Sequence, residues 1–170
     1  DFNLDYGVDV GPLGSLKVYA SATHVIDSIT QRSTDLPAVE TAGYYGTPLK
    51  WRGTVGLDLN HGPWSVSWNM QYYGSYSVKF ATDNTAVDNV TPVLIQGNDK
   101  IPSQSYHDVS FAYRFANDRG PFHGLGITVG IQNLFDKEAP VDVKRILIGG
   151  RSAFGDPRLR RVLVSLQKEF

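Results

Sequence analysis

Histidine, serine and acidic side chains are the groups that could carry chemistry in this chain of 170 residues, because it contains no cysteine. Without cysteine, disulfides, thiolate catalysis and cysteine-based zinc sites are excluded. The four histidines fall on different predicted elements without the spacing of a metal site: His24, His61, His107 and His123. Neighbouring strand residues point to opposite faces, so His107 and Asp108 cannot reach one site. We therefore predict no metal, no cofactor and no catalytic residue.

Nucleotide and nucleic-acid binding are also unsupported. The segment 124–130 contains three glycines, but their spacing differs from that of a nucleotide loop and no helix follows it. The formal net charge is −1, whereas a nucleic-acid-binding domain needs a clustered basic face. We expect small residues pointing inward from a strand to explain the glycines.

Seven segments alternate apolar and polar residues with a period of two, which is typical of β-strands with one apolar face. They cover approximately residues 2–10, 16–24, 51–60, 64–73, 108–115, 125–132 and 161–170. The connections alternate between short turns and long polar stretches near 28–49, 79–103 and 137–156. Such alternation is typical of outer-membrane barrels, whose short turns are periplasmic and whose long loops are extracellular. The predicted fold is all-β, an antiparallel transmembrane β-barrel segment.

Aromatic residues stand at both ends of the predicted strands, as they do in barrels with a girdle at each membrane interface. Trp64 and Phe115 lie beside short turns, and Trp51, Tyr72 and Phe135 lie near the long loops. The alternative is a soluble β-sheet binding module with aromatic strand ends. Bacterial single-chain barrels have even strand numbers, and an open sheet would expose unpaired edges to lipid. We therefore expect residues 1–170 to be the C-terminal portion of a larger barrel.

Two segments resemble motifs of TonB-dependent outer-membrane receptors. Residues 130–140, GIQNLFDKEAP, are similar to the family's GxxNLFDKxxP segment, and residues 156–170, DPRLRRVLVSLQKEF, are similar to its closing DPRGRRxxVSLxxxF. Residues 51–76 also resemble a hairpin of the family that ends in Tyr-Gly-Ser-Tyr. There are two departures, because Leu159 stands where glycine is common and Lys168 replaces an aromatic residue.

The resemblance implies a barrel of about 22 strands with a plug domain in its lumen. Such receptors import siderophores, cobalamin, haem or oligosaccharides across the outer membrane of Gram-negative bacteria, and the inner-membrane TonB complex supplies the energy. We expect the plug domain and the TonB box, which is the contact with TonB, to lie outside these residues. A segment of a passive porin-like channel is the alternative, because it would share the strands and the terminal phenylalanine.

Two sets of residues are candidates for function. The outward residues of the last predicted strand fit the C-terminal signal that the resemblance assigns to the outer-membrane assembly machinery: Val162, Val164, Leu166 and Phe170. Four loop tyrosines are candidate contacts to the unknown nutrient or parts of the aromatic girdle: Tyr44, Tyr45, Tyr73 and Tyr76. Asp5, Asp58, Asp108, Arg52 and Arg114 should face the lumen. Since charged residues are expected in any wet lumen, we predict no enzyme activity.

Deleting Phe170 should reduce insertion into the outer membrane and leave substrate preference unchanged. The physical reason is that the terminal ring completes the apolar face that the last strand turns towards lipid. The measurement is the amount of folded barrel in outer-membrane fractions, with deletion of a residue in a long loop as the control. Full assembly of the Phe170-deleted protein would contradict the assignment.

Overall fold

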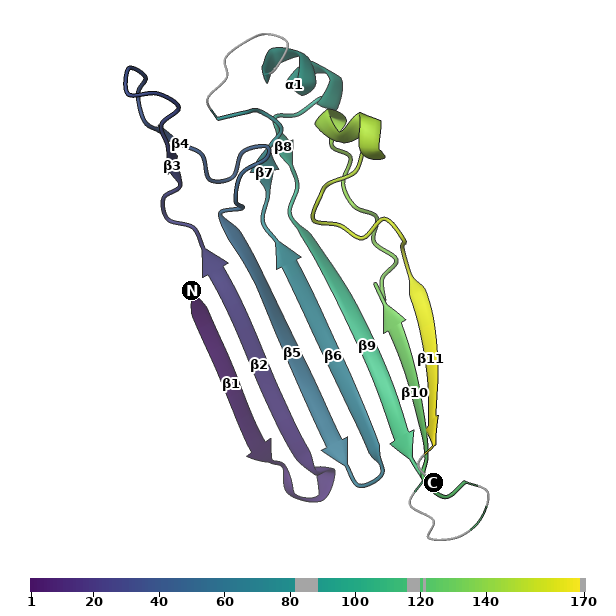
Figure 1. The fold of residues 1–170 in the computed structure, drawn as a ribbon. Helices are drawn as coiled ribbons and strands as arrows, with labels where there is room; N and C mark the ends of the chain where they lie inside the picture. The colour runs from purple at the N-terminus through teal and green to yellow at the C-terminus, as the bar shows by residue number, and fades with distance from the viewer. Residues whose placement is uncertain (82–88, 116–119, 121, 169–170) are drawn as a thin grey trace.

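The molecule is built around one antiparallel sheet of seven long strands in which each strand pairs with the next one along the chain (Figure 1). A computed structural model describes residues 1–170 except 82–88, 116–119, 121 and 169–170. The strands, in their order across the sheet, are β1 (Phe2–Asp9), β2 (Ser15–His24), β5 (Trp51–His61), β6 (Trp64–Tyr73), β9 (Gln104–Arg114), β10 (Leu125–Gln132) and β11 (Arg161–Lys168). The predicted all-β class and the seven strands are confirmed. β9 begins at Gln104, earlier than the alternation near Asp108 predicted.

The connections differ sharply between the two ends of the sheet (Figure 1). At one end, the 3-10 helix η1 (Gly11–Leu13) joins β1 to β2, and a tight turn joins β5 to β6. At the other end, the three long loops carry their own short elements: β3 (Ile29–Thr30), β4 (Val39–Glu40), β7 (Tyr76–Ser77), α1 (Thr91–Gln96), β8 (Lys100–Ile101) and the 3-10 helix η3 (Val143–Ile148). The predicted alternation of short and long connections is confirmed for the connections that the structure describes, and the predicted turn between β9 and β10 falls largely on residues outside that part of the chain. The short elements inside the loops were not predicted.

Across the described residues, the helices are too short or too polar to cross a membrane.

Strand register places apolar residues in continuous rows across the whole sheet. One row is Val8, Leu16, Leu59, Val66, Phe111, Val129 and Val164, and the next is Tyr6, Val18, Leu57, Trp68, Val109, Ile131 and Val162. A one-residue slip in any strand would turn its apolar residues to the other face. The side chains of both rows are exposed or half-buried, and 66% of the surface of Val164 is accessible. A continuous apolar face of this size needs an apolar environment.

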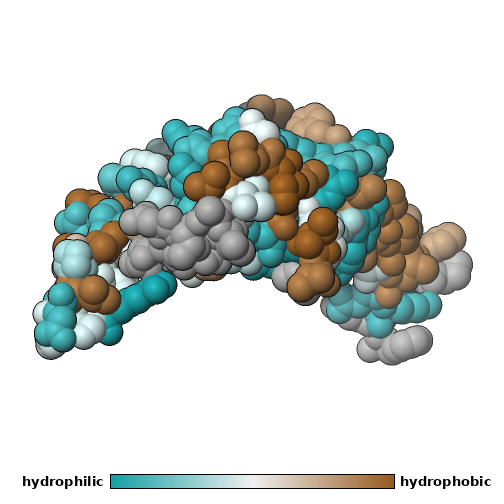
Figure 2. All heavy atoms as spheres, turned by 90° about the horizontal axis from the view of Figure 1, so that it is seen from above, coloured by the Kyte–Doolittle hydropathy of each residue, from teal (hydrophilic) through white to brown (hydrophobic). Residues whose placement is uncertain are grey.

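The opposite face of the sheet carries small and polar residues. One of its rows is Asp9, Ser15, Asn60, Ser65, Ala112, Thr128 and Ser165. Seen from the loop end, the sheet bends into an arc (Figure 2). A hollow of about 600 Å³ is lined mostly by residues of this polar face, including Ser65, Thr128 and Gln167. The polar face is therefore the concave face, as in a segment of barrel wall.

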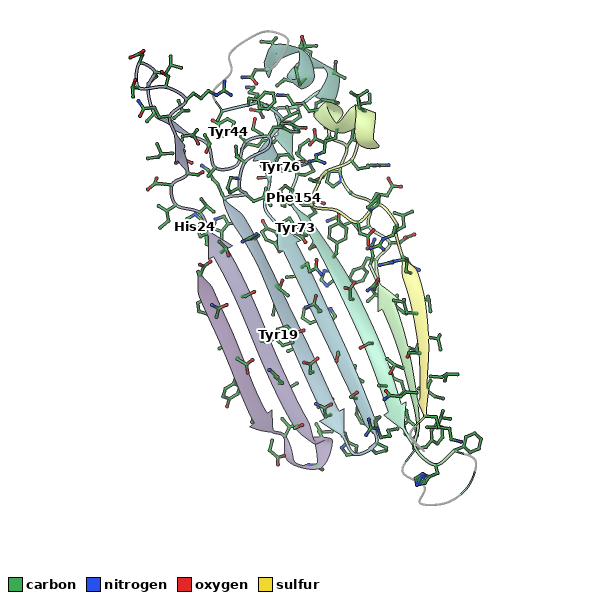
Figure 3. All side chains as sticks on the ribbon, in the orientation of Figure 1. Tyr19, His24, Tyr44, Tyr73, Tyr76 and Phe154 are labelled. Carbon is green, nitrogen blue, oxygen red and sulfur yellow. The ribbon has the colours of Figure 1, made fainter. Side chains whose placement is uncertain are left out.

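Tyr19 bridges three strands on the concave face. Its ring lies over Gly56, where an added Cβ would stand 2.2 Å from Tyr19 Cζ. The Tyr19 hydroxyl accepts a hydrogen bond from Asn69 Nδ2 at 3.3 Å. The tyrosine is labelled near the middle of the sheet in Figure 3. Only glycine leaves room at residue 56 for this ring.

Aromatic residues border the apolar rows at both ends. Trp51 and Tyr72 lie at the loop end of β5 and β6, and Trp64 begins β6 at the other end. With a rise of about 3.3 Å per residue, the distance along β6 from Trp64 to Tyr72 is roughly 26 Å. Because barrel strands tilt by about 35–45°, that length spans roughly 20 Å of height, which is most of an apolar band about 25 Å tall. The structure thus agrees with the predicted girdle residues in these two strands.

The turn after β10 explains the Asn-Leu-Phe-Asp sequence. Asn133 has a φ of 51° and Asp136 a φ of 53°, in the left-handed region that asparagine and aspartate tolerate best among residues other than glycine. The Asn133 amide group accepts from the Lys137 backbone N–H at 2.9 Å and donates to the Lys137 carbonyl at 2.9 Å. Asp108 Oδ1 accepts the Asn133 backbone N–H at 2.8 Å, which ties the turn to β9. Asparagine suits position 133 because it tolerates the left-handed backbone conformation and because its amide oxygen and its amide nitrogen both form hydrogen bonds.

Leu159, just before β11, adopts a φ of 59°. The next backbone N–H, that of Arg160, donates to Asp136 Oδ1 at 2.8 Å, so the chain is held in this bend. A left-handed conformation costs a residue with a side chain about 1–2 kcal/mol. The bend accounts for the glycine that the resemblance places at this position.

The stability of Leu159 variants should therefore depend on how well the new residue tolerates the left-handed backbone conformation, and not on the size of its side chain. We expect Leu159→Gly to unfold at the same or a higher temperature than the natural protein, and Leu159→Val to lose about 1 kcal/mol, because β-branched residues resist the left-handed region. Thermal unfolding of the protein in detergent measures this, with Leu163→Val in regular strand β11 as the control. A glycine variant less stable than the valine variant would contradict the explanation.

Candidate functional site

The loop end of the concave face holds a packed group of side chains that we call the rim cluster: Tyr73, Tyr76, Gln104, Tyr106, Asp142, Ser152 and Phe154. Tyr73 ends β6, and Gln104 and Tyr106 begin β9 on the same face of the sheet. Phe154, from the loop between β10 and β11, stacks on Tyr73 with ring centroids 5.7 Å apart and meets Tyr76 edge-on at 5.6 Å. Figure 3 shows Tyr73, Tyr76 and Phe154 gathered where the strands give way to the loops.

Hydrogen bonds inside the rim cluster join two loops to β9. The Tyr76 hydroxyl donates to Asp142 Oδ2 at 2.7 Å and lies 3.2 Å from Ser152 Oγ. Gln104 Nε2 donates to Ser152 Oγ at 2.7 Å, and Gln104 Oε1 accepts from the Tyr106 hydroxyl at 2.6 Å. Burial raises the pKa of Tyr76 well above its usual range, so its hydroxyl stays protonated and able to donate. These hydrogen bonds connect the two loops to β9 and can hold them in place.

The Asp142 carboxylate is fully buried, and Asp142 caps the N-terminus of η3. Its Oδ1 atom accepts from the Lys144 backbone N–H at 3.1 Å, while Oδ2 accepts from Tyr76. A buried carboxylate is costly unless hydrogen bonds satisfy it. One side chain therefore fixes both the start of η3 and the position of β7.

A cation–π contact joins all three long loops. Lys144 Nζ lies 3.6 Å from the centroid of the Phe80 ring and 5.2 Å from that of the Tyr45 ring. Tyr45 and Phe80 meet edge-on at 5.3 Å. Since the three residues come from different loops, this contact and the rim cluster make the loop end one connected body.

Contacts between oppositely charged side chains hold the start of β11 in place. Asp156 receives a bidentate contact from Arg158, with Nε to Oδ1 at 2.8 Å and Nη2 to Oδ2 at 2.9 Å. These bonds and the Arg158 backbone N–H lower the pKa of Asp156 to about 2. Arg161, at the first position of β11, lies 3.5 Å from the same carboxylate. Asp156 therefore remains ionised at ordinary pH and aligns the strand with its loop.

A hollow of about 330 Å³ opens on the concave face beside the rim cluster. Its lining includes Arg52, Thr54 and Tyr73, together with Ser21 and Thr23 of β2. A guanidinium surrounded by hydroxyl groups offers hydrogen bonds to a polar solute. These side chains can bind and orient a solute, but they include no paired nucleophile and base.

The predicted loop tyrosines fall into three different surroundings. Tyr73 and Tyr76 come together in the rim cluster, where Tyr76 is only 4% exposed. Tyr45 packs against Phe80 and Lys144, and Tyr44 lines a separate pocket over the β7–β8 ribbon. Their role as ligand contacts stays a prediction. Sequence reasoning missed Phe154, Asp142 and Phe80, which lie in segments without periodicity and meet their partners far along the chain.

The predicted assembly residues lie along the outer face of β11. Val162, Val164 and Leu166 alternate with residues of the concave face, and each is about two-thirds exposed. β11 pairs with β10 alone among the described strands, so it forms one border of the sheet, and β1 forms the other. Phe170 lies outside the described residues. The exposed face and the sheet border are both properties that an assembly factor could recognise.

The histidines are placed apart, and three of them lie against tryptophan rings of the outer face. His24 stacks on Trp51 at 4.0 Å, His61 lies 5.0 Å from Trp64, and His107 lies 5.7 Å from Trp68. Within the described residues, no three histidine or acidic side chains gather where a metal ion could bind. The charged residues predicted to face the lumen occupy positions of the polar face: Asp5, Arg52, Asp58, Asp108 and Arg114.

Two solved structures of the ferric enterobactin receptor PfeA from Pseudomonas aeruginosa resemble this chain. One is a single mutant that shares 18% identity, with a TM-score of 0.58 over 99% of this chain and 22% of the receptor. The other is a double mutant with 17% identity and a TM-score of 0.58 over 96% of this chain and 21% of the receptor. No protein-family model and no curated protein match the chain. The likeness shows the fold, and the chain spans about a fifth of the receptor's length.

Replacing Tyr76 tests whether the rim cluster anchors the loops. Tyr76→Phe keeps the ring on Phe154 but removes the hydrogen bond to buried Asp142, which should cost about 1–3 kcal/mol of local stability. Hydrogen exchange of the amides in residues 133–160 measures the loss as faster exchange. Tyr72→Phe, on the outer face, is the matched control and should leave the exchange unchanged. Equal exchange in both variants would contradict the anchoring role.

Proposed function

We propose that this chain is the C-terminal part of the barrel wall of a TonB-dependent outer-membrane receptor. The observation that carries the proposal is the pair of apolar rows that cross all seven strands, with small and polar residues on the concave face. A surface facing lipid and a surface facing a wet lumen require this division. The motif resemblance and the fold shared with PfeA support the same proposal.

The two borders of the sheet support a larger barrel. In lipid, each unpaired backbone N–H or C=O group costs several kcal/mol, so strands span membranes only when the barrel is closed. β1 and β11 pair on one side among the described strands. The fraction of PfeA that this chain matches, 22%, agrees with a part of a wall and not with a whole barrel. Further strands joining β1 to β11 would complete the proposed structure.

In the proposed receptor, this part of the barrel wall takes part in transport. The chain would supply the outer loops and part of the lumen for a scarce, large nutrient, with ferric siderophores as the first class to test because PfeA is a ferric enterobactin receptor. Cobalamin, haem and oligosaccharides are the other classes. A plug domain and the TonB complex would act through parts of the protein outside these residues. The compact loop end offers a fixed surface for capture.

Measurements of transport distinguish the receptor from a passive channel. The complete protein in liposomes should exclude small sugars in a swelling assay, because a plug fills the lumen of a receptor. In cells, nutrient uptake that depends on this protein should stop when a protonophore removes the proton-motive force. A known porin serves as the control for swelling. Rapid sugar permeation combined with uptake that survives the protonophore would overturn the receptor proposal in favour of a channel.

A further inference from the structure

A pocket with three lysines lies beside the β7–β8 ribbon, and Tyr76 of the rim cluster is among the residues that line it. Tyr76 pairs with Ile101, and both side chains are buried towards the cluster. Ser77 pairs with Lys100, and because strand residues alternate, these two side chains point the other way. This space of about 280 Å³ is called the lysine pocket, and its lining includes Tyr44, Lys50, Ser77, Lys79, Asp99 and Lys100.

The charges around the lysine pocket are unbalanced. Three lysines line it, and the lining contains a single acidic residue, Asp99, whose Oδ2 lies 3.8 Å from Lys79 Nζ. The nearby Glu40 carboxylate accepts the backbone N–H of Ala42 at 2.7 Å and that of Ser28 at 3.0 Å, and these bonds, together with the attraction of Lys50, lower the pKa of Glu40. Glu40 is therefore ionised and offsets part of the charge of Lys50. With Asp99 and Glu40 counted against three lysines, the pocket keeps one excess positive charge.

The backbone beneath the lysines is fixed. The Gly43 carbonyl accepts the Ser77 backbone N–H at 2.7 Å, and the Tyr45 backbone N–H donates to the Lys79 carbonyl at 2.9 Å. Gly43 has a φ of +80°, and a Cβ added there would lie 3.2 Å from Lys50 Cγ. The aliphatic stem of Lys50 thus lies against Gly43.

We propose that the lysine pocket binds a phosphate or a similar oxyanion. Ammonium groups bind phosphate as point charges, and the hydroxyl groups of Tyr44 and Ser77 can add hydrogen bonds. Lys50 directly precedes Trp51, the aromatic residue at the loop end of β5. In the proposed barrel, that height corresponds to the polar headgroup layer. The anion is either the phosphate of a lipid headgroup or a soluble anionic solute. The charge of the pocket is the same whichever nutrient the receptor carries.

Calorimetry with inorganic pyrophosphate tests the pocket in the complete protein, purified in detergent at low ionic strength. The natural protein should bind pyrophosphate, and the double variant Lys50→Gln with Lys100→Gln should bind it at least about tenfold more weakly. Both side chains are exposed, so the variant should keep the circular dichroism of the natural protein. Lys137→Gln, which changes an exposed lysine in another loop, is the matched control and should bind normally.

Phosphorus that copurifies with the protein distinguishes the two sources of the anion. Less lipid phosphorus on the double variant than on the control identifies a headgroup phosphate, and equal lipid phosphorus with weaker pyrophosphate binding identifies a soluble anion. Either result supports the site. Equal lipid phosphorus on the double variant and the control, together with either no pyrophosphate binding to the natural protein or equal pyrophosphate affinity in the two variants, would overturn it. The pyrophosphate measurement requires no transport, so it stands apart from the proposed function.

Discussion

Backbone hydrogen bonding between neighbouring strands is the constraint on which the rest of this structure depends. Once seven strands pair in sequence, the register decides which residues share a face, and one slip would mix the apolar and polar rows. The rows that cross from Val8 to Val164 and from Tyr6 to Val162 contain only apolar residues. In water such a face would be a liability, whereas in lipid it is a requirement.

The concave face and the loop end follow from the same register. Small residues on the concave face leave room above the sheet, and Tyr19 uses the space over Gly56 to bridge β2, β5 and β6. At the loop end, Tyr73 and Gln104 emerge on the concave side and become the base of the rim cluster. The loops are then joined by one buried acid, Asp142, and one cation, Lys144. A wall that captures solutes needs such a fixed outer surface, because ordering mobile loops on binding would weaken affinity.

The sequence predicted the sheet far better than the loops, and the reason is physical. Strand faces repeat every two residues, so Val66 and Ser67 reveal their sides without any knowledge of their neighbours. The rim cluster depends on Tyr76 meeting Asp142 across a long stretch of chain, and no local pattern announces that contact. Leu159 is intermediate: the resemblance marked it as a departure, and its φ of 59° explains why glycine suits the position. The convergence of Lys50 and Lys100 was equally hidden, because the charges of each loop look mixed when read along the chain.

The central claim is that the sheet spans a membrane with its apolar face against lipid. Spin labels on single cysteines introduced along β6 test it directly, since residues 1–170 contain no other cysteine that would be labelled. In the protein reconstituted in bilayers, labels at Val66, Trp68 and Met70 should collide with oxygen, which dissolves in lipid. Labels at Ser67, Asn69 and Gln71 should be shielded from lipid, and their oxygen collisions should be fewer. An oxygen accessibility that alternates with a period of two is the predicted result, and uniform accessibility along β6 would contradict the account.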